Sequence, residues 1–397
     1  MTDILKLANH QDKRLRAGHL WVYSNEVDTK ATPLKAFTPG QPVSFESAQG
    51  KWLGWGYVNP NSLIAGRVLS RDKRFQLDQS FFVHRIKIAL GLRKALYDKP
   101  YYRLIFGEGD ALPGVVVDRF GDYLSVQITT AGMDTVKEEL VAALDKVLKP
   151  KGILLRNDSP VREQEGLERY TEVALGEVPG LVMLEEGESR FEVSLAEGQK
   201  TGWFYDQAAN RERLQRYVAD KKVLDVCSYV GGWGIRAAAA GASEVACVDI
   251  SANALDQVEH NAALNNLQDK IATVQGDALK SIKALKAEGE RYDVIVLDPP
   301  AFIKRKKDLK EGTLAYKRLN EAAMGLLSKD GLLVSASCSF HMDRDNLLRT
   351  VQQAARHADR NLQLLEYGQQ SPDHPVHPAI VETAYLKAYY LRVLPTL

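Results

Sequence analysis

The stretch "KVLDVCSYVGGWGIRAAAAGASEVACVDIS", residues 222–251, holds two valine-rich apolar runs separated by a glycine-rich turn and an alanine-rich segment. Short apolar runs of this kind indicate buried strands, and the alanine-rich segment indicates a helix. A strand, a helix and a second strand in this order predict a parallel pair joined by a crossover helix.

The same alternation continues to residue 339. It predicts an α/β domain with a Rossmann-like, mostly parallel sheet covered by helices on both faces. Ligands of such sheets bind at the carboxyl ends of the strands. The further segments are "ANALDQVEHNAALNNL" (252–267), "IATVQGDAL" (271–279), "YDVIVLDPPAF" (292–302) and "AYKRLNEAAMGLLSKDGLLVSASCS" (315–339).

Residues 1–75 contain short strand candidates bounded by turn residues, which predicts a small β-rich domain. This region carries 11 Lys and Arg against 6 Asp and Glu, although the net charge of the whole chain is only +1. A basic surface with interleaved aromatic residues suits RNA, whereas the tryptophans among them are expected to fill the core. The aromatic residues are Trp21, Tyr23, Trp52, Trp55 and Tyr57.

Residues 76–193 predict an α+β middle domain without residues of evident chemical function. Helical patterns occupy 81–96 and 135–148, and two β-branched runs in "VVVDRFGDYLSVQI" (115–128) predict a hairpin. The remaining residues, 194–397, form the third predicted domain.

The cysteine and charge patterns exclude several classes of protein. Three cysteines (Cys227, Cys247 and Cys338) are too few for a disulfide framework, and their spacing offers no metal site. Cys227 and Cys247 lie inside apolar runs and are expected in the core. The chain lacks an export signal and an apolar run long enough to span a membrane, so we expect a cytoplasmic protein.

Three carboxylates follow successive predicted strands and indicate an adenosyl ligand. Asp225 precedes the turn with Gly231 and Gly232, which is not the GxGxxG of dinucleotide sites. Asp249, 24 residues later, stands where an acid can accept both hydroxyls of a ribose. Asp277, a further 28 residues on, can accept an adenine amino group. Each acid taken singly could equally cap a helix.

The segment "LDPPAF" (297–302) delivers a fourth carboxylate, Asp298, at a strand end. Pro299 and Pro300 fix the backbone after it, which presents the carboxylate rigidly to a nucleobase. The basic run "KRKKDLK" (304–310) follows and can collect phosphates or remain a solvated loop.

These motifs resemble the class I S-adenosylmethionine-dependent methyltransferases and, more closely, the bacterial large-subunit (23S) rRNA cytosine-5 methyltransferase I family. "RLRAGHLWVYSNEV" (14–27) resembles that family's PUA-type RNA-binding domain, and "GDALPGVVVDRFGDY" (109–123) its middle domain. The similarity to the catalytic domain lies in "EGQKTGWFYDQAANR" (197–211), "SYVGGWGI" (228–235), "VDIS" (248–251), "LDPPAF" and "SASCSFH" (335–341). The departures are Cys227 and Trp233 in the first loop.

The resemblance implies S-adenosylmethionine as cofactor and 23S rRNA, or a large-subunit precursor, as partner. Residues at the strand ends would line the cofactor: Asp225, Ser228, Tyr229, Gly231, Gly232, Asp249, Ile250, Asp277, Ala278 and Asp298. Residues of a preceding hairpin would close over it: Lys200, Thr201, Gly202, Phe204 and Asp206. RNA contacts are expected from Arg14, Arg16, Lys304, Arg305 and Lys306, and a homodimer is left open.

Cys338 decides which position of the base is methylated. Carbon C5 of cytosine is a poor nucleophile, so its methylation needs a thiolate added temporarily at C6. Cys338 follows an apolar run 40 residues after Asp298, and the resemblance makes it the nucleophile, with Asp298 beside it as a catalytic residue. Only roughly 3% of an unperturbed thiol is ionised at neutral pH, so a source of activation is needed. His341 is one candidate for it, and Lys200 is a candidate for removing the C5 proton.

Three other functions compete with this hypothesis. An rRNA guanine N2-methyltransferase shares the DPP motif but needs no cysteine. A nicotinamide dehydrogenase would require the missing GxGxxG motif. A noncatalytic RNA-binding ribosome-assembly factor would not need the whole set of carboxylates.

Overall fold

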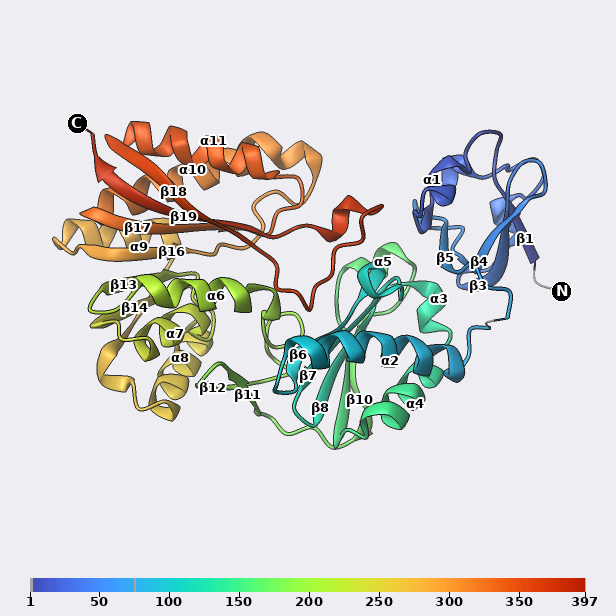
Figure 1. The fold of residues 1–397 in the computed structure, drawn as a ribbon, viewed down its shortest axis with the longest axis horizontal. Coiled ribbons are helices and arrows are strands. Elements are labelled where there is room, and N and C mark those ends of the chain that lie inside the picture. Colours follow the sequence, from blue (N-terminus) through green and yellow to red (C-terminus); the bar gives the residue numbers. More distant parts are fainter. Residues whose placement is uncertain (1–2, 75, 397) are drawn as a thin grey trace. The chain divides into compact units, whose positions relative to one another are not determined.

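The structure, a computed structural model, describes residues 3–74 and 76–396. The chain forms two compact units (Figure 1). Unit 1 comprises Met1–Val182, Ser194–Tyr205 and Asp373–Thr383, and unit 2 comprises Met183–Val193, Asp206–Pro372 and Ala384–Leu397. The division into three domains at residues 75 and 193 stays a prediction.

The first sheet of unit 1 is the β-rich domain predicted for residues 1–75. Its five strands lie in the order β1-β3-β4-β5-β2, and β1, which the sequence analysis missed, pairs in parallel with β3. Trp55 is buried in the core, as expected, whereas Trp21 and Trp52 are only half-buried. The elements are β1 Asp3–Lys6, α1 Lys13–Arg16, β2 Trp21–Val22, β3 Gln41–Glu46, β4 Trp52–Val58 and β5 Gly66–Ser70.

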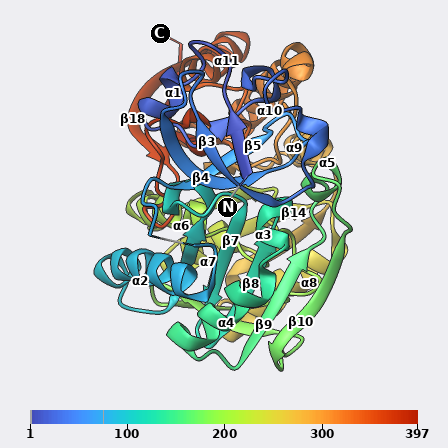
Figure 2. The same ribbon diagram turned by 90° about the vertical axis from the view of Figure 1, so that its right-hand side faces the viewer.

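The second sheet of unit 1 has the order β10-β9-β8-β7-β6, and helices α2 and α4 pack on it (Figure 2). Helix α2 begins after Asp78, whose carboxylate accepts the N–H of Phe81, and it buries Phe82 and Ile86, one turn apart. The predicted hairpin is confirmed, with Gly121 and Asp122 between its strands. The elements are α2 Gln79–Leu96, β6 Tyr101–Phe106, β7 Val115–Phe120, β8 Tyr123–Ile128, α3 Ala131–Asp134, α4 Lys137–Leu148, β9 Gly152–Asn157, α5 Val161–Gln164 and β10 Tyr170–Gly176.

Buried contacts join the two sheets of unit 1. The Tyr57 hydroxyl lies 2.9 Å from Oγ1 of Thr130, and a Cβ at Gly132 would collide with the Tyr57 ring at 2.1 Å. Glu165 accepts hydrogen bonds from Asn59 at 2.7 Å and from Arg67 at 3.1 Å. Because a buried carboxylate needs such partners, these contacts fix the first sheet on the second.

Unit 2 holds the predicted α/β sheet. Its seven strands lie in the order β15-β14-β13-β16-β17-β19-β18, with the first five parallel and the last two antiparallel to their neighbours. Beyond the hairpin of β11 Val182–Glu186 and β12 Ser189–Val193, the strands are β13 Lys222–Val226, β14 Glu244–Asp249, β15 Ile271–Gln275, β16 Tyr292–Leu297, β17 Leu327–Ser337, β18 Arg360–Gln369 and β19 Lys387–Pro395.

Helices cover both faces of this sheet, as predicted. Alternation along β13 sends Leu224 and Val226 to a core shared with α9, α10 and α11, and Val223 to a core shared with α6, α7 and α8 (Figure 1). The helices are α6 Ala208–Leu214, α7 Gly232–Ala239, α8 Ala252–Leu264, α9 Ala278–Ala287, α10 Leu309–Leu326 and α11 Arg344–His357. Within residues 3–74 and 76–396, no helix is both long and apolar enough to cross a membrane.

Candidate functional site at the carboxyl edge of the unit 2 sheet

The order of strands in unit 2 places a ligand crevice between β13 and β16. Strand β14, next in sequence after β13, lies on one side of β13, and β16 lies on the other. The loops after β13 and β16 therefore lead away from each other, and in open α/β sheets ligands bind in the crevice at the carboxyl ends of such a strand pair. Asp225 lies near the end of β13 and Asp298 directly follows β16.

The loop after β13 is held in an unusual backbone conformation. Cys227, Tyr229 and Gly231 all have positive φ, at 63°, 50° and 85°. Only glycine adopts this conformation without cost, and such strained residues gather at functional sites. The loop is fixed by the Ser228 N–H, which donates to the carbonyl of Val248 at 3.0 Å. Cys227 was predicted inside a strand, but it follows the last residue of β13 and is half-buried.

Asp225 is buried beneath this loop. Its Oδ2 accepts the N–H of Gly234 at 2.9 Å, and a Cβ on Gly234 would lie 2.5 Å from Sγ of Cys247, so no larger residue fits there. Burial raises the pKa of Asp225 to about 7, and the neighbouring carboxylates of Asp298 and Asp249 add to the rise. Within the described part of the chain, Oδ1 of Asp225 and the buried Oγ of Ser228 have no hydrogen-bond partner.

Asp249 ends β14 and contacts the same loop. Its two oxygens accept the N–H groups of Tyr229 at 2.9 Å and Ser251 at 3.0 Å. Each carboxylate oxygen has a second lone pair, so the group can still accept ligand hydroxyls. The next residue, Ile250, is 72% exposed and provides an apolar surface at the strand end.

The third predicted carboxylate has a structural role in this chain. Asp277 lies two residues beyond β15 and caps helix α9, accepting the N–H of Lys280 at 3.0 Å. Its side chain is exposed, and Ala278 begins the helix. Asp277 therefore caps a helix in this chain, and its contact with an adenine amino group stays a prediction.

Asp298 is held by two side chains that the sequence analysis did not connect with it. Its Oδ1 accepts from Nε2 of Gln207 at 2.9 Å, and its Oδ2 accepts from Nε1 of Trp233 at 3.0 Å. Burial raises the pKa of Asp298 and the nearby Asp206 adds to this, whereas the two hydrogen bonds oppose it. Trp233 is buried, so the tryptophan noted as a departure from the family pattern fixes the carboxylate.

Cys338 directly follows β17, the strand next to β16. The two strands pair in parallel with Leu297 opposite Ser335, so their ends lie side by side. The thiol is half-buried. Around it, the Ser337 hydroxyl donates to the Tyr316 hydroxyl at 2.8 Å, and Oγ of Ser339 lies 3.0 Å from the same phenol.

Lys387 also lies at this strand end and has no counterpart in the sequence-based prediction. It begins β19 opposite Ser337, and its Nζ donates to the backbone carbonyls of Ser339 at 2.5 Å and Tyr385 at 2.9 Å. The side chain is 4% exposed, and burial lowers the pKa of Lys387 to about 8. Because Lys387 lies 49 residues after Cys338 in the chain, only the pairing of β17 with β19 shows that the two residues are neighbours.

Residues 200–206 do not lie on a hairpin as predicted. The hairpin of β11 and β12 ends at Val193, and these residues form an irregular segment that enters the 3-10 helix Tyr205–Gln207. In unit 1, the Thr201 hydroxyl donates to buried Asp118, Gly202 has a φ of 114°, and Nζ of Lys200 lies 4.6 Å from the ring centroid of Phe204. In unit 2, Asp206 accepts the Tyr385 hydroxyl at 2.5 Å.

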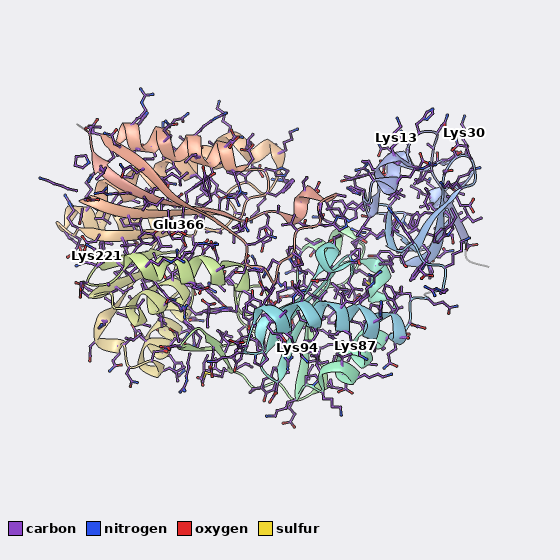
Figure 3. All side chains as sticks on the ribbon, in the orientation of Figure 1. Lys13, Lys30, Lys87, Lys94, Lys221 and Glu366 are labelled. Atoms are coloured by element: carbon purple, nitrogen blue, oxygen red, sulfur yellow. The ribbon has the colours of Figure 1, made fainter. Side chains whose placement is uncertain are left out.

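The predicted RNA-binding residues lie on the surface. Arg14 and Arg16 on α1 form ion pairs with Glu26 at 2.7 Å and Asp12 at 2.5 Å while remaining nearly half-exposed. Figure 3 labels Lys13 on the same helix. In unit 2, Lys304, Arg305 and Lys306 are exposed after the buried Ile303, with Arg305 3.3 Å from Asp308. The structure describes no cluster of metal-ligating side chains within the ranges it covers.

Comparisons with known proteins decide the family. Residues 171–392 match the model of the S-adenosylmethionine-dependent methyltransferases, and residues 5–71 match the PUA-like domain model. The chain is 37% identical to the ribosomal RNA large subunit methyltransferase I of Aliivibrio fischeri, with 99% of this chain and 100% of the relative covered. The chain belongs to the ribosomal RNA large subunit methyltransferase I family.

A further relative agrees with this assignment, and a solved structure shares the fold. The methyltransferase I of Klebsiella pneumoniae is 36% identical, with 98% of both chains covered. A solved structure from Streptococcus mutans, assigned to the SAM-dependent methyltransferases, matches with a TM-score of 0.83 over 98% of this chain and 100% of that one, at 22% identity. The last match shows the shared fold. The predicted family, fold class and cofactor are confirmed.

The residues at the crevice fit S-adenosylmethionine. Two buried oxygens, Oδ1 of Asp225 and Oγ of Ser228, need polar partners that the described protein residues do not supply. The neighbouring strand end offers the Asp249 carboxylate beside the exposed apolar surface of Ile250. Polar acceptors next to an apolar face suit a zwitterionic ligand that also carries a ribose and a base.

Proposed function

We propose that this methyltransferase I family member methylates C5 of a cytosine in large-subunit rRNA, with Cys338 as the nucleophile. The observation that supports this best is the order of three adjacent strand ends. Strands β13, β16 and β17 are neighbours, so the Asp225 crevice, Asp298 and Cys338 follow one another along the sheet edge. A base beside Asp298 would have the cofactor crevice on one side and a thiol on the other.

The cofactor would be held by the residues of the crevice. Asp225 and Ser228 supply buried acceptors, and Asp249 supplies the carboxylate for the ribose hydroxyls, with Ile250 against the adenine. S-adenosylmethionine, when bound, supplies an electrophilic methyl group. From the resemblance, Tyr229, Gly231 and Gly232 complete the loop, and Asp206 contributes from the segment that precedes α6.

Cys338 supplies the electrons that make C5 reactive. The thiolate sulfur bonds to C6, the C5=C6 double bond opens, and its electron pair moves to C5. After C5 has gained the methyl group, a base removes the C5 proton. The electron pair of the broken C5–H bond restores the C5=C6 double bond, and the sulfur leaves C6 as a thiolate. One cysteine therefore suffices for addition and release.

Asp298 orients the base. With both oxygens fixed by Gln207 and Trp233, the carboxyl group has one geometry to present to an incoming cytosine. As a carboxylate it accepts from the exocyclic amino group, and in its protonated form it donates to ring nitrogen N3. The cytosine must be unpaired or flipped out of its helix to reach it.

The test is methyl transfer to unmethylated large-subunit rRNA, with bisulfite sequencing to locate the product. We expect one protected cytosine with the wild-type protein and at least about a thousandfold loss with Cys338→Ala, because covalent activation of C5 is removed. Cys247→Ala is the matched control, since that buried thiol only packs in the core. Undiminished activity of Cys338→Ala would overturn the proposal and favour methylation of a guanine amino group.

A second measurement traps the covalent step. RNA with 5-fluorocytosine at the target position has no C5 proton to lose, so the sulfur cannot leave after methylation. We expect a protein–RNA adduct that survives denaturation with the wild type and with Cys247→Ala, but not with Cys338→Ala.

A further inference from the structure

We propose that Lys387 activates Cys338 by holding it as a thiolate through the positive charge of its ammonium group. This inference rests on the proposed function, because it supplies the nucleophile assigned there to Cys338. Lys387 acts through the sulfur and is therefore a positioning residue.

The geometry places Lys387 against both neighbours of Cys338. In the antiparallel ladder between β17 and β19, Lys387 lies opposite Ser337. Its Nζ reaches past this pair and donates to the carbonyl of Ser339 at 2.5 Å. The ammonium group is therefore fixed beside the peptide segment that carries the thiol.

Burial gives this charge a strong influence. Lys387 is 4% exposed and its hydrogen bonds go to neutral carbonyl oxygens, so water screens it little. Burying an ammonium group without a partner anion is costly, so Lys387 gains from an anion nearby. Among the charged groups that act on it, the Cys338 thiolate has the largest effect and raises the pKa of Lys387. The attraction is mutual and favours the thiolate equally.

The other groups around the thiol do not supply this charge. On α10, burial raises the pKa of Tyr316, so the phenol stays neutral at physiological pH. At the start of α11, Asp343 and Arg344 carry opposite charges, and Asp343 is engaged in capping the helix. His341 is half-exposed with its ring against Phe340, and Asp298 at the end of β16 is acidic.

The pH range of the effect follows from the pKa of Lys387. Below about pH 8 the side chain is an ammonium, so Cys338 has a cation beside it and its proton is released to solvent. Above about pH 8 the lysine becomes neutral and the assistance is lost. A cation that lowers the pKa of a thiol by about one unit raises the thiolate fraction at pH 7 about eightfold, from roughly 3%.

The experiment is the pH dependence of Cys338 alkylation by iodoacetamide, followed on the peptide that carries Cys338 by mass spectrometry. It needs neither RNA nor methyl transfer. At pH 7 we expect Lys387→Met to alkylate about eightfold more slowly than wild type, Lys387→Arg to stay within about twofold, and all rates to converge above about pH 9.5. Lys329→Met, an exposed lysine on β17, is the control for net charge and should match wild type.

Equal rates for wild type and Lys387→Met at pH 7, with equal melting temperatures, would overturn the proposal. If Lys387→Met fails to fold, the wild-type profile alone decides: a midpoint below about 8.5 supports the proposal, and one at or above it rejects it. This result is separate from the proposed function. Should Cys338→Ala still methylate rRNA, the cytosine mechanism fails while the alkylation rates still measure what Lys387 does to the thiol.

Discussion

The indole N–H of Trp233 donates to Oδ2 of Asp298 at 3.0 Å and ties the first turn of α7 to the end of β16. The two elements border the crevice from opposite sides. Gln207 completes the arrangement by donating to the other oxygen, Oδ1, at 2.9 Å. The carboxyl group proposed to meet the base is therefore fixed by side chains from two other segments of unit 2.

Trp233→Phe tests this relationship. The ring volume is largely kept, but Asp298 loses one of its two donors. Because that hydrogen bond lowers the pKa of Asp298, its loss raises the pKa. If methyl transfer uses the carboxylate, we expect the acidic limb of the pH–rate profile to move to higher pH and kcat to fall about tenfold at neutral pH. An unchanged profile would show that the tryptophan only packs.

Asp225→Asn tests the burial of the other carboxylate through stability. The pKa of Asp225 is about 7 in the folded protein against about 3.9 in an unfolded chain, so the folded state holds the proton more tightly. Below about pH 4 the group is protonated in both states and has no effect. Between about pH 4 and 7 its ionisation in the unfolded chain costs stability, and the full cost, at most about 4 kcal/mol, remains above pH 7.

Asparagine cannot ionise, and its carbonyl oxygen can still accept the Gly234 N–H. Without cofactor, we expect Asp225→Asn to melt at a higher temperature than wild type at pH 8, with the difference disappearing near pH 4. Asp256→Asn, an exposed carboxylate on α8, should show no such dependence. A difference in melting temperature between Asp225→Asn and wild type that stays the same from pH 4 to pH 8 would contradict a pKa of about 7 for Asp225.

Much of the catalytic unit could be predicted because its signals are local. Buried parallel strands are continuous apolar runs, and Asp225, Asp249 and Asp298 stand at the ends of such runs. Cys338 also directly follows such an apolar run, so its place at a strand end could be predicted in the same way. The one misplaced cysteine, Cys227, lies a single residue past the end of β13, where an apolar residue directly after Val226 hides the strand end.

What could not be predicted depends on pairings between distant segments. Lys387 meets Cys338 only because β19 turns antiparallel to β17, and Gln207 meets Asp298 across 91 residues. That Asp277 caps a helix could not be predicted, because a capping acid and a ligand-binding acid at a strand end have the same local sequence pattern. Strand β1 was missed because its four residues form a parallel edge strand without a turn to mark a hairpin.

Tyr316→Phe probes the support of the Cys338 segment. The Tyr316 hydroxyl is buried and bonds to the hydroxyls of Ser337 and Ser339, the two residues that flank the cysteine. Removing it takes one hydrogen-bond partner from each of these two serine hydroxyls, which costs about 1–3 kcal/mol. We expect a melting temperature several degrees lower and slower methyl transfer, with S-adenosylmethionine affinity unchanged by calorimetry. Weaker cofactor binding would mean that the damage spreads to the crevice.

The basic segment after the DPP motif gives the last prediction, which concerns RNA. Ile303 is buried and its N–H donates to Oγ of Ser339 at 3.2 Å, so the chain is anchored beside the Cys338 strand end. Lys304, Arg305 and Lys306 follow at once and are exposed. Phosphates flanking a base that enters the site would therefore lie within their reach.

Changing these three residues to alanine should weaken rRNA binding and make it less dependent on salt. Each single-stranded phosphate contact contributes about 0.7 to the slope of log K against log salt, so the slope should decrease by about 2. Lys87→Ala with Lys94→Ala, two exposed lysines on α2 labelled in Figure 3, is the control and should leave the slope unchanged. If the salt slope decreases equally in both variants, the three residues act on RNA binding only through the overall charge, and the segment is an ordinary solvated loop. If only the first variant loses it, the RNA contacts the protein beside Cys338, the proposed nucleophile.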